Sequence, residues 1–447
     1  MQYWRYVTAP TVVSVEMNYF DWNVSYPAIT LCPLFRPDTS YISLVVNETF
    51  EKTGLNLDSY LWAVSQSAMD TLEYFDLKVP KELLPLINPR EYALVAAKMF
   101  RLMGNSLHAN RRAPILVDAA MTEMGMCHII NSNVAIFDKP EHWNDSLRYE
   151  RRNIDLSVYD KDFFVELNNY AKVYKACIIF YCLFELTWNY ILCFFHLGRG
   201  TFIQSISIFQ VFIHSPDEAP IRTTPSFTFD FEGIMSFGLS VWSTRISEEL
   251  RHQSLRIRKC RFTTEPRGNR YPVYSYNHCI LECRINMIKK LCGCVPHFYK
   301  PLSHERVCYV QELLCVLKYR REIVTLAATE QTRKEFHYSK DIPTHSRDCE
   351  CINSCEFDLY YKDREDYEPI RGVNKLSINI TSFPKVRIVR DIIFSFYDIL
   401  LRSGGVINLC IGSSILSIVE FIVVIMKTTI CITMEASRIL PSFCLRN

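Results

Sequence analysis

An apolar run near the carboxyl end constrains the fold of this chain most strongly. Between Val406 and Met426 the only formal charge is Glu420, and a run of about 20 apolar residues is long enough to cross the hydrocarbon core of a bilayer. An ionisable residue inside such a run is costly and marks a functional site by default. The run therefore predicts a membrane-spanning segment that has a polar function.

The residues of this run divide into two faces when they are placed on a helix. One narrow stripe contains Ile407, Ile411, Ile415, Ile418, Ile422 and Ile425, and the other half contains Gly405, Asn408, Gly412, Ser413, Ser417 and Glu420. Isoleucine suits lipid, whereas small residues let helices approach closely or line a water-filled path. The run alone leaves two interpretations open, a single-pass anchor and an ion conduit. A backbone break at 412–414 is an alternative to one continuous helix, because irregular backbone is tolerated where it lines a cavity.

The cysteine content places most of the chain in an oxidising compartment. The sequence has 18 cysteines, and ten of them fall between Cys260 and Cys355, which is typical of a disulfide framework. N-glycosylation tripeptides agree with this, and their acceptors are Asn23, Asn47, Asn144 and Asn379. Zinc is the rival explanation, but Cys292-Gly-Cys294 and Cys349-Glu-Cys351 are spaced more tightly than the usual zinc knuckle. We therefore expect disulfides and no bound metal.

A second apolar run, from Ala176 to Phe195, interrupts this organisation. Only Glu185 is charged within it, and three interpretations are open: a buried insertion, a real membrane span, or a stretch foreign to the native protein, such as translated non-coding sequence. The parity of the cysteines favours the third. Fifteen cysteines precede the C-terminal run, and removal of the three in this stretch leaves an even number, 12.

The residues that follow Met1 contain no apolar region of the kind found in a signal peptide. The disulfides and glycosylation acceptors nonetheless require that the residues before the C-terminal run be exported. We therefore expect that an upstream membrane span is missing from this sequence.

Hydrophobic periodicity predicts a chain of mixed α and β structure. Helical spacing is found within residues 58–110, 275–291 and 305–335, whereas 1–25 is predicted to be extended and 26–50 to form strands broken by prolines. Strands are expected near Met126–Ile130 and within 221–245. Alternation of apolar and polar residues, as in Lys375–Ile380, predicts further strands within 356–390.

Six motifs follow one another along the chain. They are Pro10–Glu16, Tyr26–Cys32, Gly125–Asn131, His214–Pro220, the cysteine pattern from Lys259 to Cys355, and Gly404–Glu420. In this order they resemble the epithelial sodium channel/degenerin family, and most closely its insect pickpocket branch. The resemblance implies an α+β membrane protein, in which a large disulfide-rich extracellular domain with a β-sheet palm and a helical finger and thumb stands on transmembrane helices.

The resemblance also implies boundaries. Residues 1–8 would be the remnant of, or exit from, a first span that is absent here. Residues 9–385 would be extracellular, 386–427 would be the pore-lining transmembrane segment, and 428–447 a cytoplasmic tail. The thumb would occupy about 260–356 and the anomalous apolar insertion about 171–210.

The same resemblance implies a set of disulfides, which would join two antiparallel thumb helices into a stiff lever. They are Cys260–Cys355, Cys279–Cys351, Cys283–Cys349, Cys292–Cys315 and Cys294–Cys308, with Cys32–Cys127 outside the thumb.

The pore residues are carried over from the same resemblance. The selectivity filter would be Gly412, Ser413 and Ser414, where backbone carbonyls would replace part of the hydration shell of a sodium ion. Further pore-lining residues would be Gly404, Gly405, Asn408, Ser417 and Glu420, and the outer mouth would be formed by Leu401 and Arg402. Arg402 stands where the family usually has Asp or Asn, and a ring of arginines would repel cations.

The expected function is therefore a pore-forming subunit of a trimeric, amiloride-sensitive sodium channel in the plasma membrane. Its partners would be identical or related subunits, membrane lipid and an extracellular ligand, and it would need no cofactor besides the permeant Na⁺. The net charge of +2 gives no reason to expect nucleic acid as a partner. The alternatives are a disulfide-rich single-pass receptor or adhesion ectodomain and a non-functional, truncated channel product.

Enzymatic activity is not expected. The chain has no Gly-x-Ser-x-Gly elbow, no His-Glu-x-x-His and no phosphate-binding loop. The sequence from His214 to Asp217 contains three residue types of a catalytic triad, but adjacent residues cannot form that geometry by themselves. Asp217 and Glu218 are interpreted as part of a solvated loop rather than as an acidic pair.

Overall fold

The computed structural model describes residues 11–17, 24–33, 57–73, 77, 79–100, 117–151, 155–156, 162–166, 209–229, 233–370, 374–382, 386–392, 396–412 and 415–436. The chain divides into two units, one made of residues 1–14, 246–258 and 389–447 and the other of residues 15–245 and 259–388. The expected apolar insertion lies outside the described residues except at its end, where β8 (Phe209–His214) begins. The expected first segment, 1–8, also lies outside them.

A six-stranded sheet is built around the long strand β10 (Gly233–Ile246). Its order is β1 (Thr11–Glu16), β13 (Arg387–Ile392), β10, β12 (Asn374–Ser382) and β7 (Asp162–Glu166), and β11 (Phe357–Glu368) also pairs with β10. β12 runs parallel to β10, whereas β11 runs antiparallel to it. β10 forms a strand because its apolar residues alternate with polar ones and enter the core, as do Phe237 and Leu239.

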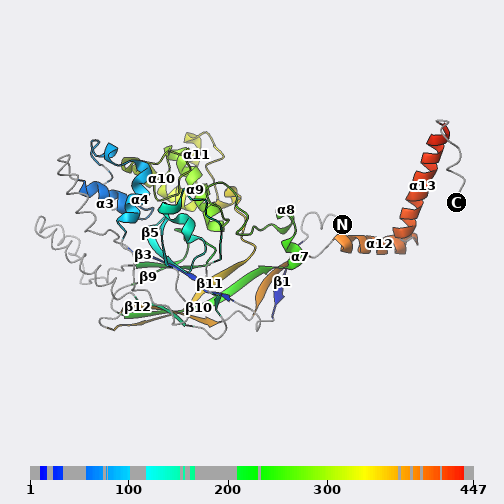
Figure 1. Ribbon diagram of the computed structural model, residues 1–447, viewed down its shortest axis with the longest axis horizontal. Coiled ribbons are helices and arrows are strands. Elements are labelled where there is room, and N and C mark those ends of the chain that lie inside the picture. Colours follow the sequence, from blue (N-terminus) through cyan, green and yellow to red (C-terminus); the bar gives the residue numbers. More distant parts are fainter. Residues whose placement is uncertain are drawn as a thin grey trace, which may run out of the picture. The chain divides into compact units, whose positions relative to one another are not determined.

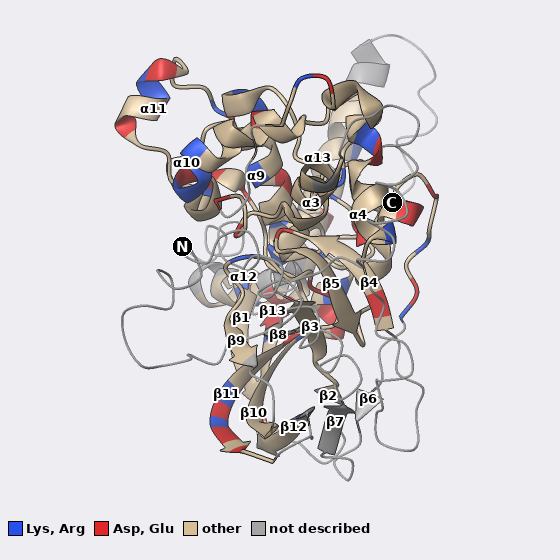
Figure 2. Ribbon diagram, turned by 90° about the vertical axis from the view of Figure 1, so that its left-hand side faces the viewer, with Lys and Arg blue, Asp and Glu red and all other residues tan. Residues whose placement is uncertain are grey.

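The strand β11 shows how this sheet protects its edge. Among the described strands it pairs only with β10, and it carries a mixed series of charges from Lys362 to Glu368, which is visible in Figure 2. Charged side chains on an edge strand disfavour pairing with another chain. A register shift between Gly238 and Leu239 accompanies these charges, and a Cβ added at Gly238 would lie 2.7 Å from Thr381 Cγ2, so a larger residue there would force Thr381 to shift.

The second large sheet has five antiparallel strands. Its order is β4 (Val117–Thr122), β5 (Gly125–Ile130), β3 (Ala28–Pro33), β8 and β9 (Ser226–Phe229). Every residue of β3 and β5 is buried, including the polar Thr30 and His128, so neither strand has the apolar–polar alternation of a strand with one face in water. Two further short strands, β2 (Val24–Ser25) and β6 (Asp155–Leu156), pair with each other.

The helices of the larger unit gather above the five-stranded sheet in Figures 1 and 2. They are α3 (Asp58–Gln66), α4 (Tyr92–Lys98), α9 (Tyr276–Cys292), α10 (Leu313–Thr325) and α11 (Glu330–Glu335), with 3₁₀ turns η2 (Leu84–Leu86), η3 (Pro89–Glu91), η4 (Ala135–Asp138), η5 (Pro140–His142), η6 (Val310–Glu312) and η7 (Ser346–Cys349). Residues of α3, α4, α9 and α10 share one apolar core. The smaller unit contains α7 (Glu248–Arg251), α8 (Leu255–Arg258), α12 (Phe396–Ile411) and α13 (Ile415–Ala436).

The ends of α9 follow from its sequence. Ser275 accepts a hydrogen bond from the backbone N–H of His278 and caps the amino end. Gly293 adopts a φ of 73° at the carboxyl end, where its N–H donates to the carbonyl of Lys289. The helix predicted over 275–291 therefore ends within one residue of its expected limits.

The structure contains the six disulfides that the resemblance implies: Cys32–Cys127, Cys260–Cys355, Cys279–Cys351, Cys283–Cys349, Cys292–Cys315 and Cys294–Cys308. The expectation that they join two antiparallel helices is wrong for most of them. Only Cys292–Cys315 links α9 to α10, whereas Cys279 and Cys283, one turn apart on α9, hold the segment that includes η7. The reason is that residues 349–351 belong to a later segment of the chain than α10, and this segment lies along the face of α9 that carries Cys279 and Cys283.

A buried carboxylate, Glu123, connects several parts of the larger unit. It lies in the turn between β4 and β5 and is 1% exposed. Its Oε2 accepts hydrogen bonds from the guanidinium of Arg284 on α9 and from the backbone N–H of Arg222, and its Oε1 accepts one from the Tyr299 hydroxyl at 2.6 Å. Its backbone carbonyl accepts from the N–H of Met69, which follows α3, at 2.8 Å. One residue thus ties the sheet to segments that are far away in sequence.

We predict that Glu123→Met destabilises the protein by about 3–5 kcal/mol, because it leaves the Arg284 guanidinium buried without its acceptor. The double variant Glu123→Met/Arg284→Met should regain part of this loss, since it buries no uncompensated charge. The measurement is the thermal unfolding midpoint of the purified full-length chain in detergent.

A matched control is Glu365→Ala. Glu365 pairs with Lys362 on the surface, where both side chains are about one-third exposed or more, and such pairs contribute about 0–1 kcal/mol. Equal shifts for Glu123→Met and Glu365→Ala would contradict the importance given to Glu123.

Candidate functional site

The predicted filter lies at a break between two helices. α12 ends at Ile411, Gly412 follows with a φ of 70°, and its N–H donates to the carbonyl of Asn408 at 2.9 Å. α13 begins at Ile415. A positive φ of this size strains any residue that has a Cβ, so glycine is needed at position 412. The break that was one alternative for the sequence is therefore present, and the single-helix projection applies only up to Ile411.

The other predicted pore residues are distributed over both helices. Leu401, Arg402, Gly404, Gly405 and Asn408 lie on α12, whereas Ser417 and Glu420 lie on α13. Ser413 and Ser414 fall outside the described residues. Asn408, Ser417 and Glu420 are exposed, and nothing lies within 4 Å of a Cβ added at Gly405 or Gly412.

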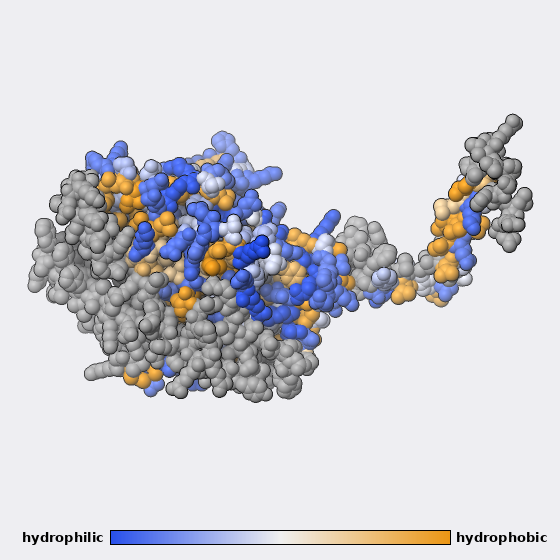
Figure 3. Space-filling view, viewed as in Figure 1, coloured by the Kyte–Doolittle hydropathy of each residue, from blue (hydrophilic) through white to orange (hydrophobic). Residues whose placement is uncertain are grey.

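Both helices expose large apolar side chains. Leu401 is 72% exposed and Leu409 is 89% exposed on α12, and Leu416 and Phe421 are 72% and 66% exposed on α13. Figure 3 shows the hydrophobic surface along α13. Side chains of this kind on successive turns would be unusual on a protein surface in water.

No helix in the described part of the chain meets the length and hydropathy expected of a membrane span.

The expected limits of this segment, 386–427, differ from the observed elements. Residues 387–392 form β13, which belongs to the six-stranded sheet, and helical structure begins only at Phe396. At the other end, α13 continues to Ala436, beyond the expected start of the tail. The hydroxyl of Thr428 donates to the carbonyl of Val424 at 2.7 Å, which lets a polar residue stay inside an apolar helix.

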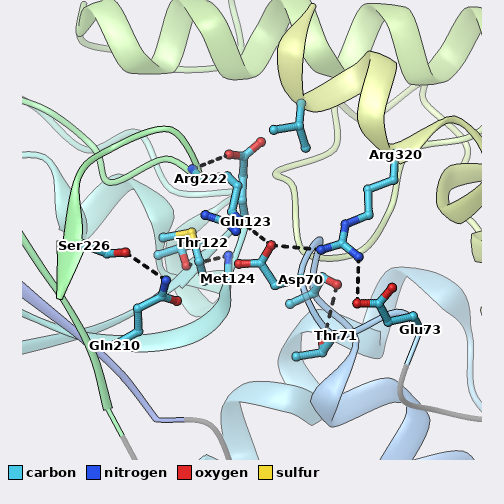
Figure 4. Close-up of polar contacts among 12 residues, drawn as sticks. Asp70, Thr71, Glu73, Thr122, Glu123, Met124, Gln210, Arg222, Ser226 and Arg320 are labelled. Carbon is cyan, nitrogen blue, oxygen red and sulfur yellow. Dashed lines mark hydrogen bonds and ion pairs between the residues drawn. The ribbon is translucent and has the colours of Figure 1, made fainter. Parts of the chain in front are cut away.

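A cluster of charges joins the helical region to the five-stranded sheet (Figure 4). Asp70, in the turn after α3, accepts from Arg222 and, at 3.4 Å, from Arg320 of α10. Arg320 also contacts Glu73 at 3.2 Å. These side chains are partly exposed, so solvent screens the cluster and breaking it costs less than breaking the buried Glu123–Arg284 pair.

The interpretation of Asp217 and Glu218 as a solvated loop is wrong. Both are partly buried. Asp217 accepts from Asn133 and from the Tyr149 hydroxyl at 2.7 and 2.8 Å, whereas Glu218 faces the start of α9. They do not form an acidic pair, because each has its own set of donors.

Two buried histidines remain neutral at physiological pH. Burial lowers the pKa of His214 to about 4, although the carbonyl of Ser215 raises it in part. The ring donates from Nδ1 to that carbonyl at 2.9 Å, so Nε2 accepts from the Thr30 hydroxyl at 2.8 Å. Burial likewise lowers the pKa of His297 to about 4, and its Nε2–H donates to the carbonyl of Val64. His214 therefore contributes to packing and hydrogen bonding rather than to a triad.

The predicted glycosylation acceptors differ in their surroundings. Asn144 is exposed in a turn after η5. Asn379 lies in β12, between Gly238 of β10 and Asp162 of β7, and is partly exposed. Asn23 and Asn47 are outside the described residues. The exposed turn makes Asn144 the most accessible of the described acceptors.

The sequence interpretation missed the residues that hold the larger unit together. The sequence contains one indication that Arg284 has a buried partner. Arg284 lies between Ile280 and Ile288 on the apolar face of α9, and charged residues are almost never fully buried unless they are paired. The sequence contains no such indication for its partner Glu123, because a glutamate before Met124 and Gly125 is ordinary for a hairpin turn.

Comparison with known proteins agrees with the resemblance. A model of the amiloride-sensitive sodium channel family matches residues 1–424, so the chain belongs to this family. It is 27% identical to Pickpocket protein 11 of Drosophila melanogaster over 230 residues, which cover 48% of this chain and 41% of that protein. It is also 27% identical to Sodium channel protein Nach of Drosophila virilis over 190 residues, which cover 41% of this chain and 47% of that protein.

A third relative is Pickpocket protein 19 of Drosophila melanogaster, at 26% identity over 196 residues, which cover 41% of this chain and 37% of that protein. In all three cases the match spans less than half the length of the relative. The family membership points to a sodium channel subunit.

We predict that acidification destabilises the protein through the two buried histidines, His214 and His297. Each is neutral when folded but has a pKa near 6.5 when unfolded. The unfolded state therefore binds more protons as the pH falls below 6.5, and stability is lost between pH 6.5 and 4. At pH 5 the loss is about 2 kcal/mol for each histidine.

The test is the unfolding midpoint of the full-length chain at pH 7.5, 6 and 5, compared with His297→Gln. Glutamine can still donate to Val64 but does not titrate, so this variant should have a flatter pH dependence. A parent and variant with the same slope between pH 7.5 and 5 would show that His297 is not a source of the effect.

Proposed function

We propose that this chain is a pore-forming subunit of a trimeric, amiloride-sensitive cation channel that conducts sodium across the plasma membrane. The observation that carries the proposal is the break at Gly412 between two helices that expose apolar side chains, in a chain of the sodium channel family. A simple anchor has no need for a left-handed glycine in its middle. The larger unit would then lie outside the cell, where disulfides persist.

The break between α12 and α13 would provide a physical basis for selectivity among cations. Helix backbone hides its carbonyls in i→i−4 hydrogen bonds, whereas an interrupted segment can turn carbonyls toward an ion. Gly412, Ser413 and Ser414 are small, so three chains could approach closely at this level. Glu420 would add a ring of three carboxylates on α13, which attracts cations.

Arg402 counts against fast conduction. It lies on α12, ten residues before Gly412, and is exposed. In a three-fold assembly three guanidinium groups at the entrance would raise the energy of an approaching cation. We therefore assign this subunit a small sodium conductance, or a place beside related subunits that lack the arginine.

We predict that Ser414→Trp abolishes current or changes the ratio of sodium to potassium permeability, because a bulky side chain blocks the approach of three chains. The chain would be expressed with related pickpocket-type subunits in oocytes and recorded under voltage clamp, with amiloride as the blocker. Surface labelling would confirm equal delivery of the parent and the variant.

Thr428→Trp is the matched control, since it adds the same bulk to α13 beyond the break and should leave permeability unchanged. Unchanged current and selectivity in Ser414→Trp at equal surface density would contradict the filter assignment. Absence of amiloride-blocked current with every related subunit would instead favour a receptor or adhesion ectodomain.

A further inference from the structure

A single carboxylate connects the five-stranded sheet to the start of the thumb region, residues 260–356. Glu218 lies in the turn that follows β8. Its Oε2 accepts from the Ser275 hydroxyl at 2.6 Å and from the N–H of Asn277 at 3.0 Å. Its Oε1 accepts from the N–H of Tyr276 at 3.2 Å and from the Ser354 hydroxyl at 3.0 Å.

These donors come from both ends of the thumb region. Ser275 to Asn277 begin α9, and Ser354 stands beside Cys355, whose disulfide to Cys260 closes the region. The contact is also reciprocal, because the Asn277 side chain donates to the carbonyl of Ala219 at 2.6 Å. The turn after β8 therefore binds the thumb region where the chain enters it and where the chain leaves it.

The chemistry requires a carboxylate. All four partners of Glu218 donate, and an ionised carboxylate only accepts. One backbone N–H faces each oxygen, and a backbone N–H cannot reverse its role as a hydroxyl can. A glutamine at this position would therefore place its NH₂ group against a backbone N–H in either amide orientation. The negative charge also lies at the amino end of α9, where the helix dipole favours it.

Three polar contacts tie α9 to residues outside the thumb region, and one of them joins His278 to Asp138 of η4 at 2.9 Å. Arg284 is fixed by the buried Glu123, and Tyr276 and Asn277 are fixed by Glu218. Residues 276 and 284 are roughly 12 Å apart along a helix that rises 1.5 Å per residue. Loss of the Glu218 contacts would release the first residues of α9 from the turn after β8 and leave the polar contacts of His278 and Arg284 to hold the helix.

We propose that Glu218 is a positioning residue for channel opening. With the Glu123–Arg284 pair as a pivot, it fixes the angle of the thumb region against the five-stranded sheet. A stimulus that moves the thumb region then acts on β11, which begins at Phe357 directly after Cys355. The role in opening rests on the channel function proposed above, whereas the role in fixing the angle does not.

Glu218→Gln is the test variant, and Asp217→Asn is its matched control. Asp217 is the adjacent carboxylate, and the donors to it, Asn133 and Tyr149, lie outside the thumb region. Spin labels on unnatural amino acids at Lys290 and Thr228, which are both exposed, would report the distance between α9 and β9. The measurement uses the full-length chain in detergent.

We expect a broader or shifted distance distribution for Glu218→Gln and the parental distribution for Asp217→Asn. In voltage clamp, Glu218→Gln should change the ratio of open to closed channels about tenfold at equal surface density, the effect of losing one hydrogen bond to a charged group. Ser354→Ala, which removes one neutral donor only, should change both readouts in the same direction but less, and it covers the case in which Glu218→Gln fails to fold.

Two results would overturn the proposal. An unchanged distance distribution in Glu218→Gln would show that the carboxylate only caps α9 locally. A changed distribution with an unchanged ratio of open to closed channels would show that the angle of the thumb region has no influence on opening. If the parent carries no current, the channel function fails together with the role in opening, while the distance measurement still decides whether Glu218 fixes α9.

Discussion

The burial of one carboxylate constrains the arrangement of the larger unit. Glu123 and Arg284 are almost completely buried, and a charge in this position is tolerated only when its hydrogen bonds are satisfied. The donors to Glu123 come from α9, from Tyr299 and from the turn after β8. The sheet, the long helix and the connecting turn must therefore take one mutual arrangement, since any other leaves a charge without partners.

The disulfides stabilise the larger unit in a different way. They restrict the unfolded chain, and five of them lie within residues 260–355. They make the thumb region rigid within itself, but none of these five reaches the five-stranded sheet. That rigid body is joined to the rest of the unit by non-covalent contacts, which include a shared apolar core and the polar contacts of Glu123 and Glu218. Within this unit, disulfides therefore hold the thumb region together, whereas non-covalent contacts attach it to the five-stranded sheet.

Much of the fold could be predicted from the sequence, because local patterns report local structure. The strand at Met126–Ile130 and the helix predicted over 275–291 are local features, and so is the backbone break that was one alternative at 412–414. The contact between Glu123 and Arg284 is not a local feature, since 161 residues separate them. The sequence around either residue gives no indication of its partner. The expectation that the thumb disulfides join two helices was wrong for the same reason: spacing along α9 shows which cysteines share a face, but not which segment returns to meet them.

The same rule of polar satisfaction applies in both units, with opposite outcomes. In the larger unit, four donors surround Glu218 and fix a segment in place. At Gly412 the helical hydrogen-bond ladder stops, and a glycine with a positive φ follows the last turn of α12. Backbone groups that lose helical partners must find water, protein or an ion. In apolar surroundings, a break of this kind therefore needs polar partners for the backbone groups that it frees.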